Sequence, residues 1–172
     1  MNEELVLKAI SGNKEAFCEL YGLYKDRLYR YAFYKLVDPD DAEDAVSDCV
    51  LQAWKGLPDL RSPKAFNSWI FKILAACCAK RIKAMIDERD NLSRIHDVGF
   101  GHPSIDPQRS AELAEALSQL KDEDREIVLL SVVAGLKSNE IAEYKGITAG
   151  TVRSRISRGL TKMREFLSQG EK

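Results

Sequence analysis

A block of basic residues near the end of the chain has the composition of a nucleic-acid contact. Residues 145–164 contain six Lys or Arg residues and no Asp or Glu, although the formal net charge of the whole chain is only −1. A guanidinium group can hold a guanine or a phosphate through two parallel hydrogen bonds, and Ser and Thr hydroxyls can contact bases or phosphates. The block therefore indicates DNA binding, and a solvated helix face that binds nothing is the alternative.

The spacing of apolar residues in this block predicts a two-faced helix over residues 149–168. With about 100° of rotation per residue, five apolar side chains fall within an arc of about 80° and are expected to pack inward. Basic and hydroxyl residues lie on the opposite side, and Arg153 and Arg164 lie at the edge of the apolar stripe. The stripe consists of Val152, Ile156, Leu160, Met163 and Leu167, and the opposite side of Ser154, Arg155, Arg158, Thr161 and Lys162.

Residues 138–148 predict how this helix is positioned. Ser138 is expected to cap a short helix over residues 138–145, Gly146 to open a tight turn, and Thr148 to cap the following helix. Two helices joined by a short turn that contains Gly form a helix-turn-helix, whose second helix enters the major groove of DNA. The candidate DNA contacts of this motif are Thr148, Gly150, Thr151, Arg153, Ser154, Arg155, Arg158 and Lys162.

The remaining sequence predicts an all-α fold. No segment combines the alternation of a strand with enrichment in β-branched residues. Asn13 is a residue type that caps helices, and Asp38, Ser62 and Asp106 each stand before Pro, which favours the first position of a helix. Helices are expected over residues 2–11, 13–36, 39–56, 63–86, 107–120, 122–134, 138–145 and 149–168.

Residues 87–106 are expected to separate two small helical domains. This segment is polar, contains Gly99, Gly101 and Pro103, and has no apolar stripe, so it is predicted to be a flexible linker. The N-terminal domain then comprises residues 1–86 and the C-terminal domain residues 107–172. Each domain is long enough for a core of three or four helices.

Two further blocks of charge lie in the predicted N-terminal domain. Residues 38–48 contain six acidic residues and no basic one, whereas residues 60–86 contain six basic residues and no acidic one. Separate blocks of opposite sign indicate several partner surfaces rather than one uniformly basic face. The acidic block opens a predicted helix, where the helix dipole favours negative charge, so simple capping and solvation is its alternative explanation.

Other classes of function find no support in the sequence. There is no apolar run long enough to cross a membrane and no secretory signal, so we expect a cytoplasmic protein without membrane insertion. The four cysteines and two histidines lack metal-ligand spacing; buried, reduced thiols are expected, and a redox-sensing thiol stays an open alternative. Paired carboxylates, a nucleophile with its base, and a phosphate-binding Gly loop are all missing, which argues against an enzyme and against a cofactor.

Residues 120–167 carry a specific combination of short motifs. They contain Arg-Glu at 125–126, Gly-Leu at 135–136, Glu-Ile-Ala at 140–142 and Gly-Thr-Val-Arg-Ser-Arg at 150–155. This combination resembles the C-terminal domain of bacterial RNA polymerase sigma factors of the extracytoplasmic-function (ECF) group, sigma-70 family. Lys121 stands where that family commonly has Pro. The resemblance implies that the second helix of the helix-turn-helix reads the minus-thirty-five promoter element.

The acidic helix is similar to the segment of these sigma factors that docks on core polymerase. In the family, a motif like Asp-Ala-Glu-Asp-x-x-Gln-Glu, followed by Ala-Trp, binds the clamp helices of the polymerase β′ subunit. Asp44 and Asp48 match its acidic positions, and Ser47 stands where Gln is usual. The polymerase contacts implied by the resemblance are Asp41, Asp44, Ser47, Asp48 and Gln52.

The next predicted helix, residues 63–86, is similar to the promoter-melting segment of the family, which holds the non-template strand of the minus-ten element. Aromatic and basic side chains together suit single-stranded DNA, but Phe66, Trp69 and Phe71 are expected mainly in the core. Ala-Ala-Cys-Cys at 75–78 stands where the family commonly has Arg-Asn, so weaker or differently specified melting is expected. The implied minus-ten contacts are Arg61, Lys64, Asn67, Lys80, Arg81 and Lys83.

The resemblance implies a function in transcription initiation. A sigma factor of this group binds core polymerase through the β′ clamp helices and the β flap and directs it to promoters in response to a stress or environmental signal. It has no catalytic chemistry of its own and no cofactor, and it commonly has a membrane-linked anti-sigma factor as inhibitor. A DNA-binding regulator that never joins polymerase is the alternative, and the acidic and the aromatic-basic helices argue against it.

Overall fold

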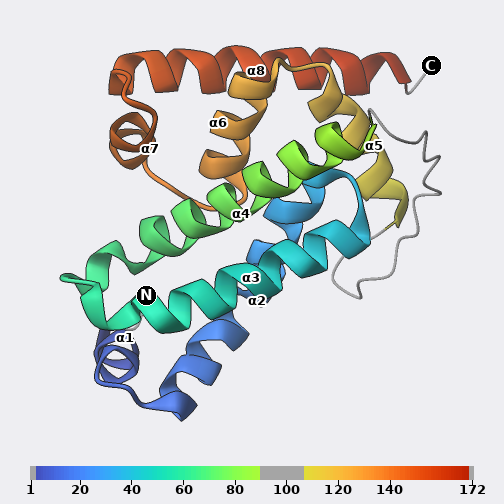
Figure 1. Ribbon diagram of the computed structural model, residues 1–172. Helices are drawn as coiled ribbons and strands as arrows, with labels where there is room; N and C mark the ends of the chain where they lie inside the picture. The colour runs from blue at the N-terminus through green and yellow to red at the C-terminus, as the bar shows by residue number, and fades with distance from the viewer. Residues whose placement is uncertain (1–2, 90–106, 171–172) are drawn as a thin grey trace. The chain divides into compact units, whose positions relative to one another are not determined.

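The computed structural model describes residues 3–89 and 107–170, and every regular element in these two ranges is a helix (Figure 1). The all-α fold expected from the sequence is thereby confirmed. The chain divides into two compact units, residues 1–98 and residues 99–172. Among the described residues, no helix has both the length and the apolar character that crossing a membrane requires.

The described part of the N-terminal unit is a helical bundle with two short 3-10 turns. Its elements are α1 Glu3–Ile10, α2 Lys14–Leu36, α3 Pro39–Gly56, η1 Leu57–Asp59, η2 Pro63–Ala65 and α4 Phe66–Arg89. Helices α2, α3 and α4 pack against one another, and α1 packs against α2 and the two 3-10 turns (Figure 1). The bundle therefore places the acidic helix α3 directly beside the basic helix α4.

Caps predicted from the sequence set the turns between these helices. The Asn13 side chain accepts a hydrogen bond of 2.8 Å from the backbone N–H of Ala16 and starts α2. Asp38 accepts one of 2.9 Å from the N–H of Asp41 and starts α3. Between them, Val37 ends α2 in the left-handed conformation, with φ of 62°. The chain thus reverses within two residues and returns α3 along α2.

Aromatic rings fill the core of the N-terminal unit. Phe71 of α4 is fully buried and meets the ring of Tyr31 edge-on, with 5.8 Å between centroids. Phe66 is also buried and meets Tyr24 in the same way at 5.3 Å. Trp69 is partly buried, and its ring centroid lies 5.9 Å from that of Phe66. The aromatic residues of α4 are therefore mainly packing residues, as predicted.

The boundaries of α4 differ from the prediction. A 3-10 turn, η2, precedes the helix, and Ser62 before it makes no side-chain capping bond. At its other end α4 continues to Arg89, past the predicted end at 86 and into the predicted linker. The rest of that linker, residues 90–106, lies outside the described residues, and so does the expected cap Asp106.

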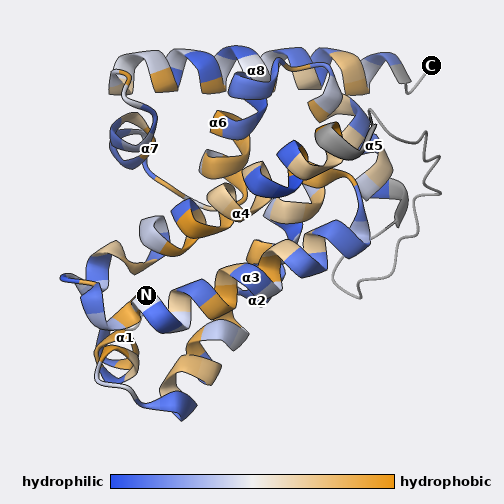
Figure 2. Ribbon diagram, viewed as in Figure 1, coloured by the Kyte–Doolittle hydropathy of each residue, from blue (hydrophilic) through white to orange (hydrophobic). Residues whose placement is uncertain are grey.

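The described part of the C-terminal unit is organised around one long helix. Its elements are α5 Pro107–Ser118, α6 Asp122–Val132, α7 Ser138–Lys145 and α8 Ala149–Gly170. Helix α8 packs against the other three and lies across them in Figure 1. Hydrophobic and hydrophilic residues alternate along α8 in Figure 2, as expected for a helix with one packed and one exposed face.

The cap of α7 lies one residue before the predicted one. Ser138 is already the first helical residue, and Lys137 is the cap. The backbone N–H of Lys137 donates a hydrogen bond of 2.7 Å to the carboxylate of Glu140. The Glu140 side chain thus reaches back over the first turn and satisfies the backbone N–H of the cap residue. Glu140 therefore has a structural use in starting the helix-turn-helix.

The packed face of α8 also differs from the predicted one. Leu160 and Leu167 were assigned to the packed stripe, but their side chains are 37% and 38% exposed. Gly159 is buried in the packed face instead. It lies so close to α6 that a Cβ at this position would be only 2.9 Å from Cγ2 of Val128. The missing side chain lets the α8 backbone approach α6, so the packed face includes Gly159 and leaves out Leu160 and Leu167. The prediction that Leu160 and Leu167 pack inward is therefore wrong.

Candidate nucleic-acid interface

Helices α7 and α8 and the turn between them have the geometry of a helix-turn-helix. Gly146 ends α7 in the left-handed conformation, with φ of 65°, and the N–H of Ile147 closes the turn on the carbonyl of Ala142 at 3.1 Å. Thr148 Oγ1 accepts a hydrogen bond of 3.1 Å from the N–H of Thr151 and caps α8 as predicted. The two Thr hydroxyls lie 2.9 Å apart and bond to each other. This turn fixes the direction in which α8 leaves.

The exposed face of α8 presents arginine and hydroxyl side chains. Arg153, Ser154 and Arg158 are all exposed, and Gly150 is exposed at the start of the helix. Ser157 shares this face, since residues three or four apart lie on one side of a helix. Sequence reasoning missed Ser157, although its position three residues after Ser154 is the signal that could have found it. The first turns of α8 therefore form a polar, basic surface of the kind that meets DNA.

Two candidate bases of α8 bond to backbone carbonyls. Nε of Arg158 donates to the carbonyl of Ser154 over 3.4 Å, and Nζ of Lys162 donates to the carbonyl of Gln119 after α5. Arg158 is in no ion pair within residues 3–89 and 107–170, so its charge is uncompensated at close range. A solvated guanidinium bonded to one weak acceptor is available to an incoming phosphate or base.

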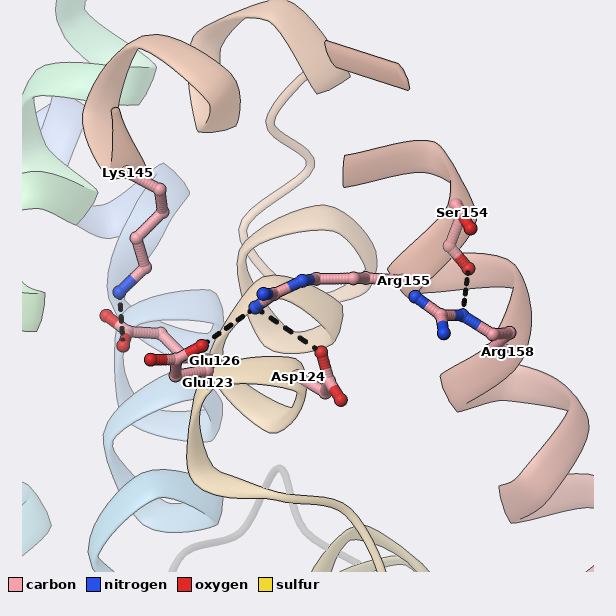
Figure 3. A network of polar contacts seen from close by, with 7 residues as sticks. All are labelled: Glu123, Asp124, Glu126, Lys145, Ser154, Arg155 and Arg158. Atoms are coloured by element: carbon pink, nitrogen blue, oxygen red, sulfur yellow. Dashed lines mark hydrogen bonds and ion pairs between the residues drawn. The ribbon is translucent and has the colours of Figure 1, made fainter. Parts of the chain in front are cut away.

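Arg155 is placed differently from the other candidate bases. Its Nη1 lies 2.9 Å from Oε2 of Glu123 and 3.6 Å from Oδ1 of Asp124, both on α6. Figure 3 shows its side chain crossing from α8 to these two carboxylates, whereas Arg158 bonds within α8. The hydrogen bond to Arg155 lowers the pKa of the Glu123 carboxyl and raises the pKa of the guanidinium. The sequence placed Arg155 beside Arg158 on the reading side, and the structure holds it against α6.

A second ion pair neutralises the first residue of the basic block. Nζ of Lys145, at the end of α7, lies 2.6 Å from Oε2 of Glu126 on α6 (Figure 3). Both side chains are largely shielded, with 25% and 15% of their surface exposed. Nζ also lies 5.3 Å from the ring centroid of Tyr144. Lys145 therefore fastens α7 to α6, and the basic block has fewer available charges than its composition indicates.

The candidate polymerase and minus-ten sites meet at the contact of α3 and α4. Nη1 of Arg81 lies 3.1 Å from Oδ1 of Asp41, and its Nη2 lies 2.9 Å from Oδ2 of Asp44. Burial opposes the charge of Arg81, but Asp44 and Asp41 outweigh it and raise the pKa of the guanidinium. A base expected to hold DNA is thus paired with two acids expected to bind polymerase. The sequence placed these residues on separate surfaces.

The other candidate polymerase contacts lie farther along α3. Ser47 is exposed and Asp48 is half-buried. Gln52 is exposed, and its Nε2 donates to Sγ of Cys77 on α4 over 3.3 Å. Asp44 is the most accessible of the paired acids, with 61% of its side chain exposed against 26% for Asp41. Asp44, Ser47, Asp48 and Gln52 therefore continue along the side of α3 that neighbours α4.

The remaining minus-ten candidates include four exposed bases and one amide. Oδ1 of Asn67 accepts a hydrogen bond of 3.2 Å from Nη2 of Arg27 on α2. The guanidinium carbon of Arg27 lies 5.3 Å from the ring centroids of both Tyr24 and Phe71. Arg27 thus fixes the side chain of Asn67 from the core, a role that no motif indicated. The exposed bases are Arg61, Lys64, Lys80 and Lys83.

Three of the four cysteines are packing residues in the described structure. Cys49, Cys77 and Cys78 are buried between α3 and α4, whereas Cys18 is exposed, so the expectation of buried thiols is wrong for Cys18. Burial raises the pKa of the Cys49 and Cys77 thiols, which disfavours the thiolate that binds metals. No group of three or more metal-binding side chains occurs among the described residues.

Both units match models of one protein family. The family model for sigma-70 region 2 matches residues 20–84, and the model for sigma-70, region 4 matches residues 110–163. The RNA polymerase sigma factor SigV of Bacillus subtilis is 32% identical over 152 residues, which cover 85% of this chain and 87% of SigV. The ECF sigma factor SigM of Mycobacterium tuberculosis is 28% identical over 170 residues, covering 96% of this chain and 84% of SigM.

This chain is an ECF sigma factor of the sigma-70 family. Its arrangement is similar to that of CnrH, solved in complex with the cytosolic domain of CnrY, with a TM-score of 0.73 and 26% identity over 98% of this chain and 97% of CnrH. It is also similar to RpoE of Bartonella quintana, solved with the anti-sigma factor NepR, with a TM-score of 0.70 and 25% identity over 88% and 96% of the two chains. The family expected from the sequence is confirmed.

The sigma factor directs RNA polymerase to promoters and initiates transcription, a regulatory role. The region 2 match covers most of α2 and all of α3, together with α4 up to residue 84. The region 4 match covers α6, α7 and most of α5 and α8. Both surfaces described above, on α3–α4 and on α8, therefore lie within the matched segments.

Proposed function

We propose that this sigma factor grips its promoter at two elements. The exposed face of α8 reads the minus-thirty-five element, and η2 with α4 holds the non-template strand of the minus-ten element. The acidic side of α3 binds the clamp helices of β′, and the C-terminal unit contacts the β flap. The observation that carries the proposal is the exposed row of Arg153, Ser154 and Arg158, which follows the Thr148 cap of a helix-turn-helix.

Arg158→Ala is expected to lower run-off transcription from a promoter selected from a library by about tenfold, because one arginine contact to a base is worth roughly 1–3 kcal/mol. Arg158 is exposed and free of ion pairs in the described structure, so its removal leaves no buried partner behind. Run-off transcript yield with core polymerase measures the effect, and affinity for core polymerase should stay unchanged.

Arg164→Ala is the matched control, since it removes an exposed arginine from the same helix, six residues farther from the capped end. A helix-turn-helix places the N-terminal part of its second helix against the bases, so this variant should lose much less activity. Equal losses in the two variants would show that the effect comes from total charge and not from a reading face.

The double change Asp44→Ala with Asp48→Ala is expected to weaken binding to core polymerase by about tenfold. These carboxylates lie on the accessible side of α3, where charge complementarity with a basic partner speeds association and fixes the docking register. Fluorescence anisotropy of the labelled sigma factor with core polymerase measures the affinity. Thermal unfolding followed by circular dichroism checks that the bundle survives the loss of the Asp44–Arg81 pair.

Glu19→Ala with Asp59→Ala removes the same charge from exposed positions of the N-terminal unit outside α3 and should leave the affinity nearly unchanged. If the two double variants bind core polymerase equally well, the acids of α3 are only solvated. If both weaken binding equally, the interaction depends on net charge and not on this side of α3.

The domain organisation belongs to the same proposal. We assign polymerase docking and the minus-ten element to residues 1–86 and the minus-thirty-five element to residues 107–172, with 87–106 between them. CnrH and RpoE were both solved with a second protein, which is an anti-sigma factor in the case of RpoE. By that similarity we also propose an anti-sigma factor, release by a stress or environmental signal, and action in the cytoplasm without catalysis, cofactor or membrane insertion.

A further inference from the structure

The α6 carboxylates that hold Arg155 lie at the edge of the proposed reading face. Arg155 follows Ser154 on α8 and precedes Arg158 by one turn, so a short swing of its long side chain would bring it to DNA bound there. In the structure its guanidinium instead bonds Glu123 at 2.9 Å and lies 3.6 Å from Asp124 (Figure 3).

We propose that Glu123 and Asp124 are specificity-determining residues, which withhold the charge of Arg155 from the phosphates of DNA that is not a promoter. The inference rests on the proposed use of α8 as the reading helix. Within that surface, Arg153 and Arg158 stay available, and Arg155 is occupied by two acids. Affinity for random DNA is then lower than the number of arginines on α8 indicates.

Simple helix capping does not account for this contact. Acids in the first turn of α6 are favoured by the helix dipole, and Asp122, Glu123 and Asp124 all occupy it. Asp122 illustrates that use, because it is 91% exposed and pairs with Arg125 of its own helix at 3.5 Å. Glu123 is also well exposed, at 78%, yet it reaches another helix and bonds Arg155. The helix dipole explains why acidic residues occupy the first turn of α6, but it does not explain why Glu123 contacts Arg155 on α8.

The physical consequence follows from how DNA-binding proteins gain affinity. Binding without sequence preference is almost entirely electrostatic, and each phosphate that is neutralised steepens the dependence of log K on log salt concentration by about 0.9. Random sites greatly outnumber promoters in a genome, so a protein that presents fewer charges to phosphates spends less time on them. Base contacts by Ser154 and Arg158 do not require the charge of Arg155.

The test is the salt dependence of binding to a random-sequence DNA duplex, measured with the full-length sigma factor by fluorescence anisotropy. Glu123→Gln with Asp124→Asn should steepen the slope by about 0.9 more than the control Asp122→Asn with Glu115→Gln. The control removes two exposed acids from the same unit without touching Arg155. In this control, Arg125 loses its ion pair with Asp122 but stays bonded to the carbonyls of Leu117 and Leu120.

Repeating the measurement in a variant that lacks Arg155 shows whether the change in slope comes from the charge of Arg155. With Arg155→Gln present, the acid variant and its control should have equal slopes, because no charge remains to be released. The proposal is overturned if the slope of the acid variant is steeper than that of its control even in the Arg155→Gln background. It is also overturned if the two slopes are equal when Arg155 is present. Arg158→Gln in the same assay tests the reading face separately: its slope should fall by about 0.9, and an unchanged slope would count against the proposed function alone.

Discussion

Phe71→Ala is expected to lower the free energy of unfolding of the N-terminal unit by about 4 kcal/mol, since deleting a buried phenylalanine ring costs about 3–5 kcal/mol. The ring is fully buried, meets Tyr31 edge-on at 5.8 Å, and lies under the guanidinium of Arg27. A cavity at this point removes contacts from both α2 and α4. A small domain has only about 5–15 kcal/mol to lose, so core-polymerase binding should fall steeply on warming.

Tryptophan fluorescence during urea titration measures this effect cleanly. The only two tryptophans of the chain, Trp54 and Trp69, both belong to the N-terminal unit, so their signal reports that unit alone. Phe71→Leu keeps an apolar side chain at the site and should cost less than about 1.5 kcal/mol. Binding of random DNA by α8 should persist in Phe71→Ala. A loss below about 1 kcal/mol, or a parallel loss of DNA binding, would contradict this account of two separate cores.

Gly159→Val is expected to destabilise the C-terminal unit by about 2–3 kcal/mol through overpacking. A Cβ at this position would lie 2.9 Å from Val128 Cγ2 and 3.5 Å from Leu120 Cδ1, and valine adds two more methyl groups. Val128 is β-branched and has little freedom to move aside, so α8 itself must shift away from α6. That shift would also lengthen the contact between Arg155 and Glu123.

Amide hydrogen exchange measures the stability of the unit that carries each change, because the most protected amides report its opening free energy. These amides are followed in α6 and α8 for Gly159→Val and in α2, α3 and α4 for the control. Gly22→Val is the matched control, since Gly22 lies in the exposed part of α2 with no atom near the position of a Cβ. The helix propensities of Gly and Val differ by less than about 0.5 kcal/mol, so the control should be nearly neutral. Equal effects at the two sites would refute close packing at Gly159.

The parts of the fold that depend on neighbouring residues could be predicted from the sequence. Asn13, Asp38 and Thr148 each cap the helix that their residue type and position predict, because a capping side chain bonds a backbone N–H only three residues away. The two-faced pattern of α8 and its turn at Gly146 are local for the same reason. Specific motifs then located the two sigma-70 segments that the family models match.

The electrostatic arrangement of the candidate sites could not be predicted in the same way. Arg81 pairs with Asp41 across 40 positions of sequence, and Arg155 pairs with Glu123 across 32. A count of charges along the chain carries no information about which helices become neighbours. Packing at Gly159 could not be predicted either. An apolar stripe is identified from side chains that are present, whereas the close approach of α8 to α6 depends on a side chain that is absent.

Because Cys49, Cys77 and Cys78 are buried between α3 and α4, the rate at which these thiols react reports how often the N-terminal helical bundle opens. An electrophile or oxidant needs an accessible thiolate, and these sulfurs are enclosed, with the thiolates of Cys49 and Cys77 further disfavoured by burial. Reaction therefore waits for opening of the bundle, which at an opening cost of about 5 kcal/mol occurs in roughly one molecule in several thousand. Cys18, exposed on α2, reacts without that delay. The ratio of the two reaction rates therefore reports how often the N-terminal unit opens.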